Sequence, residues 1–213
     1  MKKTVRKKIS GWMLVATLAL VIPSCQKEQN VSKTNPGQTL FNPSLNDVNQ
    51  NLVPFVCTGS IPQILNIPEG NKLVLQTFAK GVQIYEVRRS ATNPNVFSWV
   101  NIAPLADLYL HPDFTDQIIH HFAGPSWEFI KGPEKGEKVV AARLQGITQD
   151  QSAIQWLSLK TVDSLSTPGN KITFVQRICT VGGLAPTTGA DEAHLGALDS
   201  IPYQASYLFY TKN

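Results

Sequence analysis

Short runs of alternating apolar and polar residues recur along this chain from about residue 52, and turn residues separate them. A period of two is the pattern of a β-strand, and no long stretch shows the 3.6-residue spacing of an amphipathic helix. The segments with this pattern are 72–78, 82–87, 97–102, 118–123, 126–130, 138–147, 154–162, 171–180 and 202–211. The chain therefore predicts an all-β fold: a single sandwich or barrel-like domain of about eight or nine mostly antiparallel strands.

Several of these segments carry more specific expectations. Lys80-Gly81 predicts a break between the first two strands. Segment 154–162 suits either a strand or a short helix, and its β-branched residues favour the strand. Alternation places Ile172, Phe174 and Ile178 on one face of their strand, and Tyr203, Tyr207 and Phe209 on one side of the last strand.

Residues 1–24 predict a lipoprotein signal peptide rather than part of the fold. Five basic residues precede the apolar run 11–22, which is too short for a membrane-spanning helix of roughly twenty residues. The run ends in Ile22-Pro23-Ser24-Cys25, which resembles the lipobox of bacterial lipoproteins, although Pro23 departs from the commonest pattern. The resemblance implies cleavage before Cys25, acylation of Cys25 and attachment to a membrane. The alternative is an ordinary secretory signal with a free Cys25.

Removal of the leader changes the charge of the chain. The full sequence has 19 basic and 15 acidic residues, and five of the basic residues lie in the leader, so 14 basic and 15 acidic residues remain. No basic surface is then left to indicate nucleic acid as a partner. Residues 25–51 are rich in Asn, Gln, Ser and Pro and predict a lipidated cysteine followed by a flexible tether. The β domain is therefore expected over 52–213, in the bacterial cell envelope as an outer membrane lipoprotein, periplasmic or surface-exposed.

Cys57 and Cys179 are the two cysteines left when Cys25 carries lipid. In an oxidising compartment they could form a disulfide. They could instead be two buried thiols that never meet, because the sequence says nothing about the distance between them. Both alternatives stay open.

Several short motifs recur in an order typical of one family of secreted bacterial and fungal proteins. They are Gly81-Val82-Gln83-Ile84-Tyr85, His121-Phe122-Ala123-Gly124-Pro125-Ser126-Trp127-Glu128, Ala153-Ile154-Gln155-Trp156-Leu157, Val175-Gln176-Arg177, Thr180-Val181-Gly182-Gly183-Leu184-Ala185-Pro186 and Pro202-Tyr203-Gln204-Ala205-Ser206-Tyr207-Leu208-Phe209-Tyr210. Over about residues 61–210 the chain resembles the family catalogued as domain of unknown function 3455. The resemblance implies no particular activity.

Two positions depart from the pattern of that family. Its members often carry one cysteine two positions after the Gln-Ile-Tyr motif and another after the Thr-Gly that follows Ala-Pro. Here these positions hold Val87 and Ala190. The resemblance therefore implies that this chain lacks a bridge common in the family, and Cys57 and Cys179 would be its own variation.

His121 and Glu128 are the candidates for catalytic or metal chemistry. A hairpin closed at Gly124-Pro125 would let them face each other across two strands, and an imidazole beside a carboxylate suits an acid–base pair or two metal ligands. A third group could come from His120, His111, Asp150 or Asp116. The alternative is a cross-strand hydrogen bond or ion pair that only fixes the turn.

Arg177 lies in the middle of a strand, where it predicts either an ion pair with Glu128 or Asp191 or a polar pocket. The aromatic residues predict a β core or, if several form an exposed row, a surface for sugar rings. The candidate ligand surface consists of Trp127, Trp156, Arg177 and Tyr203. Gly182-Gly183 predicts a tight turn, since no phosphate-loop motif is present.

These observations predict an envelope lipoprotein that acts as a noncatalytic binding module for a small molecule, a glycan or an envelope component. No cofactor and no nucleic acid are expected, and a protein partner stays undetermined. One alternative is a hydrolase or metal-dependent enzyme with a site at His121 and Glu128. Another is a structural or assembly protein without a ligand.

Overall fold

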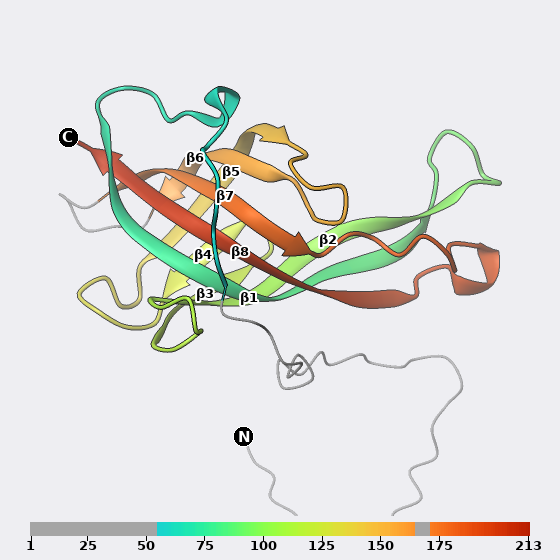
Figure 1. Ribbon diagram of the computed structural model, residues 1–213. Helices are drawn as coiled ribbons and strands as arrows, with labels where there is room; N and C mark the ends of the chain where they lie inside the picture. The colour runs from blue at the N-terminus through green and yellow to red at the C-terminus, as the bar shows by residue number, and fades with distance from the viewer. Residues whose placement is uncertain (1–54, 165–170) are drawn as a thin grey trace, which may run out of the picture. The chain divides into compact units, whose positions relative to one another are not determined.

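The computed structural model describes residues 55–164 and 171–213; the predicted signal peptide, Cys25 and the tether lie outside them. The described chain forms one closed barrel in which the strands follow each other in sequence order (Figure 1). All neighbouring strands are antiparallel, and the first pairs with the last. The strands are β1 (Asn71–Arg89), β2 (Phe97–Tyr109), β3 (Gln117–Phe122), β4 (Ser126–Phe129), β5 (Lys138–Ile147), β6 (Trp156–Ser164), β7 (Ile172–Gly182) and β8 (Leu198–Lys212).

The predicted all-β class is thus confirmed. Two short 3₁₀ turns, η2 (Gln63–Leu65) and η3 (Glu192–His194), accompany the strands. Within the described ranges, no helix is long and apolar enough to cross a membrane.

The predicted break at Lys80-Gly81 is wrong, because β1 runs through it without interruption. A Cβ at Gly81 would overlap the Leu105 carbonyl and Ala106 on β2. The glycine therefore marks a close approach of two backbones rather than the end of a strand. This merging of segments 72–78 and 82–87 reduces nine predicted segments to eight strands.

The inside of the barrel holds the inner core, which is largely aliphatic and aromatic. Its buried members are Ala79, Ala106, Leu108, Ile118, Ile119, Trp127, Phe129, Val139, Ala141, Leu159, Ile172, Val175, Tyr203, Ala205, Tyr207 and Phe209. The expectation that Tyr203, Tyr207 and Phe209 share one side of β8 is confirmed. A barrel of eight strands has an interior just wide enough for side chains to fill it or for one small ligand.

A second apolar group, the outer cluster, covers the outside of β7 and β8. It consists of Phe55, Leu65, Trp156, Ile178, Cys179 and Leu208. The blue-green segment that carries Phe55 and η2 crosses these strands in Figure 1, and the Gln176 side chain on β7 donates to the Leu65 carbonyl oxygen at 2.7 Å. The N-terminal segment of the domain is therefore packed against the barrel wall.

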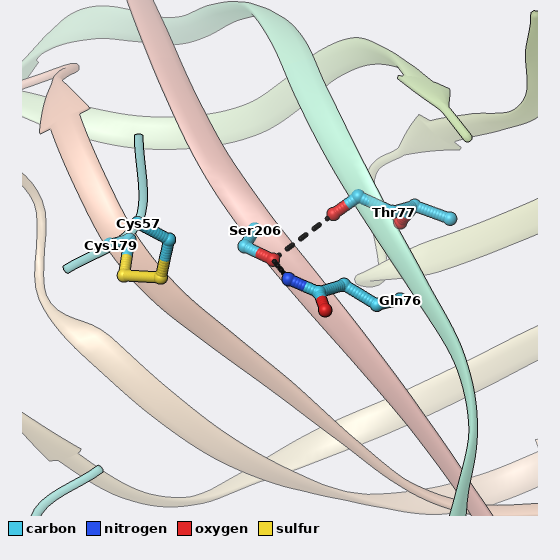
Figure 2. Close-up of a disulfide and its surroundings, with 5 residues drawn as sticks. All are labelled: Cys57, Gln76, Thr77, Cys179 and Ser206. Carbon is cyan, nitrogen blue, oxygen red and sulfur yellow. Dashed lines mark hydrogen bonds between the residues drawn. A yellow bond between two sulfur atoms is a disulfide. The ribbon is translucent and has the colours of Figure 1, made fainter. Parts of the chain in front are cut away.

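A disulfide between Cys57 and Cys179 attaches this segment covalently to β7, with the two Cα atoms 5.4 Å apart (Figure 2). On the adjoining wall, Ser206 of β8 donates to the Thr77 carbonyl of β1 and accepts from the Gln76 amide, each at 3.2 Å. The covalent link and the β1–β8 seam thus lie beside each other.

The expectation that Ile172, Phe174 and Ile178 share one face is wrong. Ile172 belongs to the inner core and Ile178 to the outer cluster. The register of β7 against β8 shifts between Ile172 and Phe174. Such a bulge changes which face the following residues occupy, and a count with a strict period of two cannot include it.

Candidate functional site

The β3–β4 hairpin does not bring His121 and Glu128 together, so this predicted pair is wrong. Phe122 pairs with Ser126 across a loop of three residues, which places His121 opposite Trp127 and His120 opposite Glu128. The prediction was off by one residue, and one residue reverses the face of a strand. His121 therefore points into the barrel, whereas Glu128 is exposed on the outside.

His121 lies in an aromatic environment that keeps it uncharged. Its ring stacks on Trp127 with centroids 4.7 Å apart and meets Tyr207 edge-on at 5.2 Å. Burial away from water lowers the pKa of His121 to about 3, because an apolar environment disfavours the imidazolium. Nδ1 lies 2.8 Å from the Ser126 carbonyl oxygen and donates to it, so Nε2 is the acceptor atom of the neutral ring.

The other predicted partners of His121 lie elsewhere. His120 binds Asp107 at 2.7 Å, Asp116 forms an ion pair with Lys131 at 3.0 Å, and the Asp150 carboxylate accepts from Ser152. His111 is exposed. Among the residues of the two described ranges, no group of three or more His, Cys, Asp or Glu could hold a metal ion.

A cavity of about 590 Å³ opens at one end of the barrel. Its lining residues come from six strands and from three loops: Gln83 and Tyr85 of β1, Asn101, Ile102 and Pro104 of β2, His121 of β3, Arg143 of β5, Leu157 of β6, Arg177 of β7, and Gly124, Pro125, Thr148, Gln151, Ala153, Ile154, Gln155 and Leu184 of the loops. The strand residues among them lie toward the C-terminal ends of β1, β3, β5 and β7 and toward the N-terminal ends of β2 and β6. Because neighbouring strands are antiparallel, these ends meet at the same end of the barrel. The cavity is within the size range typical of small-molecule sites.

Hydrogen bonds made by the lining residues fix the wall of the cavity. The Tyr85 hydroxyl donates to the Gly183 carbonyl at 2.6 Å, and Asn101 donates to the Gln83 side-chain oxygen at 3.0 Å. Gly183 has a φ of +81°, and a Cβ there would press against Tyr203 and Ile154. At the predicted turn Gly182-Gly183, the backbone therefore packs closely against Tyr203 and Ile154, and Ile154 lines the cavity.

Residues 68–211 match the model of the family described as Protein of unknown function (DUF3455). The chain belongs to this family. The match includes almost all of the barrel, from three residues before β1 to the penultimate residue of β8. Neither the curated proteins nor the solved structures yield a significant match.

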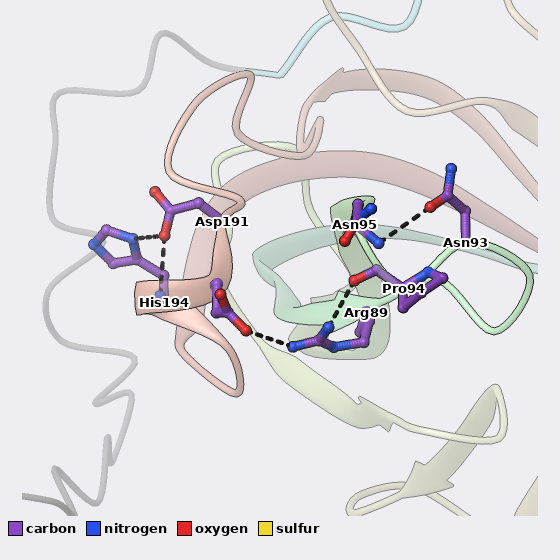
Figure 3. A network of polar contacts seen from close by, with 7 residues as sticks. Arg89, Asn93, Pro94, Asn95, Asp191 and His194 are labelled. Carbon is purple, nitrogen blue, oxygen red and sulfur yellow. Dashed lines mark hydrogen bonds and ion pairs between the residues drawn. The ribbon is translucent and has the colours of Figure 1, made fainter.

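Arg177 of this DUF3455 barrel has no carboxylate partner among the described residues, so the predicted pairing with Glu128 or Asp191 is wrong. Its Nε and Nη2 atoms donate to the Gln155 carbonyl at 3.2 and 3.0 Å. Asp191 instead binds His194 at 2.7 Å, beside the Arg89–Glu192 ion pair (Figure 3). The alternative expectation, a polar pocket, matches the position of Arg177 in the cavity wall.

The aromatic residues of the predicted ligand surface do not form an exposed row. Trp127 and Tyr203 are buried in the inner core of the DUF3455 barrel, and Trp156 belongs to the outer cluster. Of the four residues predicted for that surface, only Arg177 lines the cavity. Trp127 nevertheless supports the cavity floor, because His121 stacks on it.

The sequence analysis overlooked Gln83, Tyr85, Asn101 and Arg143 as lining residues. A signal for two of them was present. Arg143 is in phase with the buried residues Val139 and Ala141 on β5, and Gln83 follows Ala79 at even spacing on β1. A polar side chain in phase with the apolar face of a strand indicates a pocket or a buried hydrogen bond.

Proposed function

We propose that this protein is a noncatalytic binding module of the bacterial cell envelope, anchored through an acylated Cys25, which takes a small molecule into the barrel end. The observation that carries the proposal is the division of the barrel interior. Aromatic and aliphatic side chains fill one part of it, while a cavity of about 590 Å³ at one end is lined by polar as well as apolar side chains. Ligand sites commonly combine such a cavity with a few fixed polar groups.

The chemistry of the wall favours binding over catalysis. No Asp, Glu, Ser, Cys or Lys occurs among the described residues that line the cavity. His121 is the single imidazole there, and its low pKa leaves it unable to take up a proton near neutral pH. General acid–base catalysis requires a group whose pKa lies near the working pH. These properties suit a receptor that holds its ligand unchanged.

The anchor is supported by the leader and the lipobox-like Ile22-Pro23-Ser24-Cys25. Cys25→Ala is expected to leave the protein without lipid and to release it from membranes, because the acylated residue is removed. Cell fractionation and mass spectrometry of the N-terminal peptide measure both effects. Ser24→Gly, which keeps a small residue before the cysteine, is the matched control and should stay lipidated. Recovery of Cys25→Ala in the membrane fraction would contradict the anchor.

Filling the cavity is expected to abolish binding. Leu157 lines the cavity and lies opposite Arg177 in register, so Leu157→Trp places an indole in the space of the ligand. Thermal shifts with sugars, organic acids and lipids would first find a compound that stabilises the wild type. Such a ligand adds about 2.7 kcal/mol at a hundredfold excess over its Kd, and Leu157→Trp should lose this stabilisation.

Val162→Trp is the matched control for this experiment. Val162 lies on the same strand but is 65% exposed and is not a lining residue. This variant should keep the full thermal shift. A shift that persists in Leu157→Trp would mean that the compound binds outside the cavity. Absence of any shift, together with no co-purifying small molecule in native mass spectrometry, would favour a structural or assembly role.

A further inference from the structure

The charged groups of the cavity wall are all positive. Arg143 and Arg177 both line the cavity, and neither has an ion-pair partner among the described residues. No carboxylate stands among the lining residues to balance them. Arg143 is exposed, whereas Arg177 is half-buried, so Arg177 lies deeper. A buried arginine normally has an anionic partner.

The other titratable groups around Arg177 remain neutral and do not offset its charge. Burial raises the pKa of Tyr85 and Tyr207, raises that of Tyr203 well above its usual value, and lowers that of His121. The positive charge of Arg177 acts on each of these four groups. At neutral pH the interior of the cavity is therefore positive, and it attracts an anion.

The Arg177 guanidinium is held in place and still has donors to offer. The Gln155 carbonyl accepts from Nε and Nη2, and the side chain also hydrogen-bonds the Tyr207 hydroxyl, which leaves the other N–H groups of this five-donor fork without a carboxylate. The planar fork matches two oxygens of a carboxylate, phosphate or sulfate. A guanidinium that is oriented before binding loses less conformational entropy when the ligand arrives.

Gln83 supplies a second donor in the same wall. Asn101 donates to its side-chain oxygen at 3.0 Å, which fixes the orientation of the amide. The Gln83 Nε2 atom is buried and makes no hydrogen bond of normal geometry in the structure; it lies near the Tyr203 hydroxyl, where the amide partly offsets the rise in pKa that burial causes. A buried donor without a well-placed acceptor is destabilising, and a ligand oxygen would supply that acceptor.

Apolar side chains make up another part of the wall. Ile102, Pro104, Ile154, Leu157 and Leu184 line the cavity together with the two arginines. A free inorganic anion would leave these side chains without contacts. A molecule with an oxyanion at one end and a hydrocarbon or aromatic body would satisfy both parts of the wall.

We infer that the cavity binds an amphipathic small molecule through an oxyanion, carboxylate or phosphate, that pairs with Arg177 while its apolar body lies against the Leu157 side of the wall. Gln83 Nε2 donates to the same oxyanion or to an adjacent ligand oxygen, and Arg143 attracts the anion at the rim. This inference rests on the proposed function, since it names the ligand class of the same cavity.

Two fluorescent probes that differ in one charged group test the inference. 8-Anilinonaphthalene-1-sulfonate carries a sulfonate, and N-phenyl-1-naphthylamine has nearly the same aromatic body without it. Fluorescence titration of the full chain is expected to give a Kd for the sulfonate probe at least tenfold lower than for the neutral probe. Arg177→Gln should raise the Kd of the sulfonate probe at least tenfold and change the Kd of the neutral probe less than twofold.

The neutral probe also shows whether the cavity is intact in Arg177→Gln, so misfolding and loss of the anion site are distinguished. Arg177→Lys, which keeps the charge but not the fork, should recover part of the affinity. Arg143→Gln should raise the Kd of the sulfonate probe only two- to threefold. Added salt should reduce the difference in Kd between this variant and the wild type. Displacement of the bound sulfonate probe by octanoate or octyl phosphate, but not by octanol, would identify which oxyanion is preferred.

Each failure has a different meaning. If Leu157→Trp leaves the binding of both probes unchanged, the cavity is not the binding site and the proposed function fails. If both probes bind in the cavity with equal affinity, or Arg177→Gln leaves the sulfonate probe unaffected, the cavity binds ligands but the oxyanion inference is wrong.

Discussion

Replacing Cys57 and Cys179 by alanine is expected to lower the free energy of unfolding by about 4–5 kcal/mol. The disulfide joins residues separated by 122 positions. In the chain-entropy treatment, a bridge stabilises the fold by restricting the unfolded chain, and the effect increases with the length of the closed loop. Denaturant unfolding of the oxidised wild type and the double variant measures the difference as a shift in midpoint and extrapolated free energy.

The same experiment with reductant supplies the control. Reduced wild type should unfold near the double variant, and reductant should leave the double variant unchanged. Hydrogen exchange should also show faster exchange at Phe55 and Leu65, because the outer cluster packs around the bridge. Equal unfolding midpoints for oxidised wild type and the double variant would contradict the stabilising role of the bridge.

Lowering the pH from 7 to 5 is expected to cost about 2 kcal/mol of stability through His121 alone. The pKa of His121 is about 3 in the folded protein, against 6.5 for the free side chain. Below pH 6.5 the unfolded chain therefore takes up a proton that the folded protein excludes. The contribution of neutral His121 is fully present above pH 6.5 and is lost as the pH falls from 6.5 towards 3.

His121→Asn removes this titration and keeps a donor near the Ser126 carbonyl. The variant loses ring contacts and will be less stable than the wild type at every pH. The decisive quantity is therefore the change between pH 7 and pH 5, which should be smaller in the variant by about 2 kcal/mol. His111→Asn, at an exposed position, is the control for removal of a histidine. Parallel stability curves for wild type and His121→Asn would overturn the assignment.

Local patterns along the chain were sufficient for the fold class and for most strands. Segment 138–147 coincides with β5, and the segment that suited a strand or a helix is β6, beginning at Trp156. Alternation succeeds because one face of each strand packs against the core. It failed at Gly81, where the reason for the glycine is the closeness of Leu105 on another strand. The distance between Gly81 and Leu105 cannot be read from the sequence.

The candidate site depended on quantities that are not local. The β3–β4 loop of three residues set the register, so His121 faces Trp127 instead of Glu128. A bulge in β7 set which residues face inward, and the closed barrel placed Gln83, Arg143 and Arg177 from three distant segments around one cavity. The sequence by itself determined the all-β class and showed that Arg177 interrupts the apolar pattern of its strand. Register, bulges and barrel closure, which depend on pairing across long separations, decided that this arginine lines a pocket without an acid.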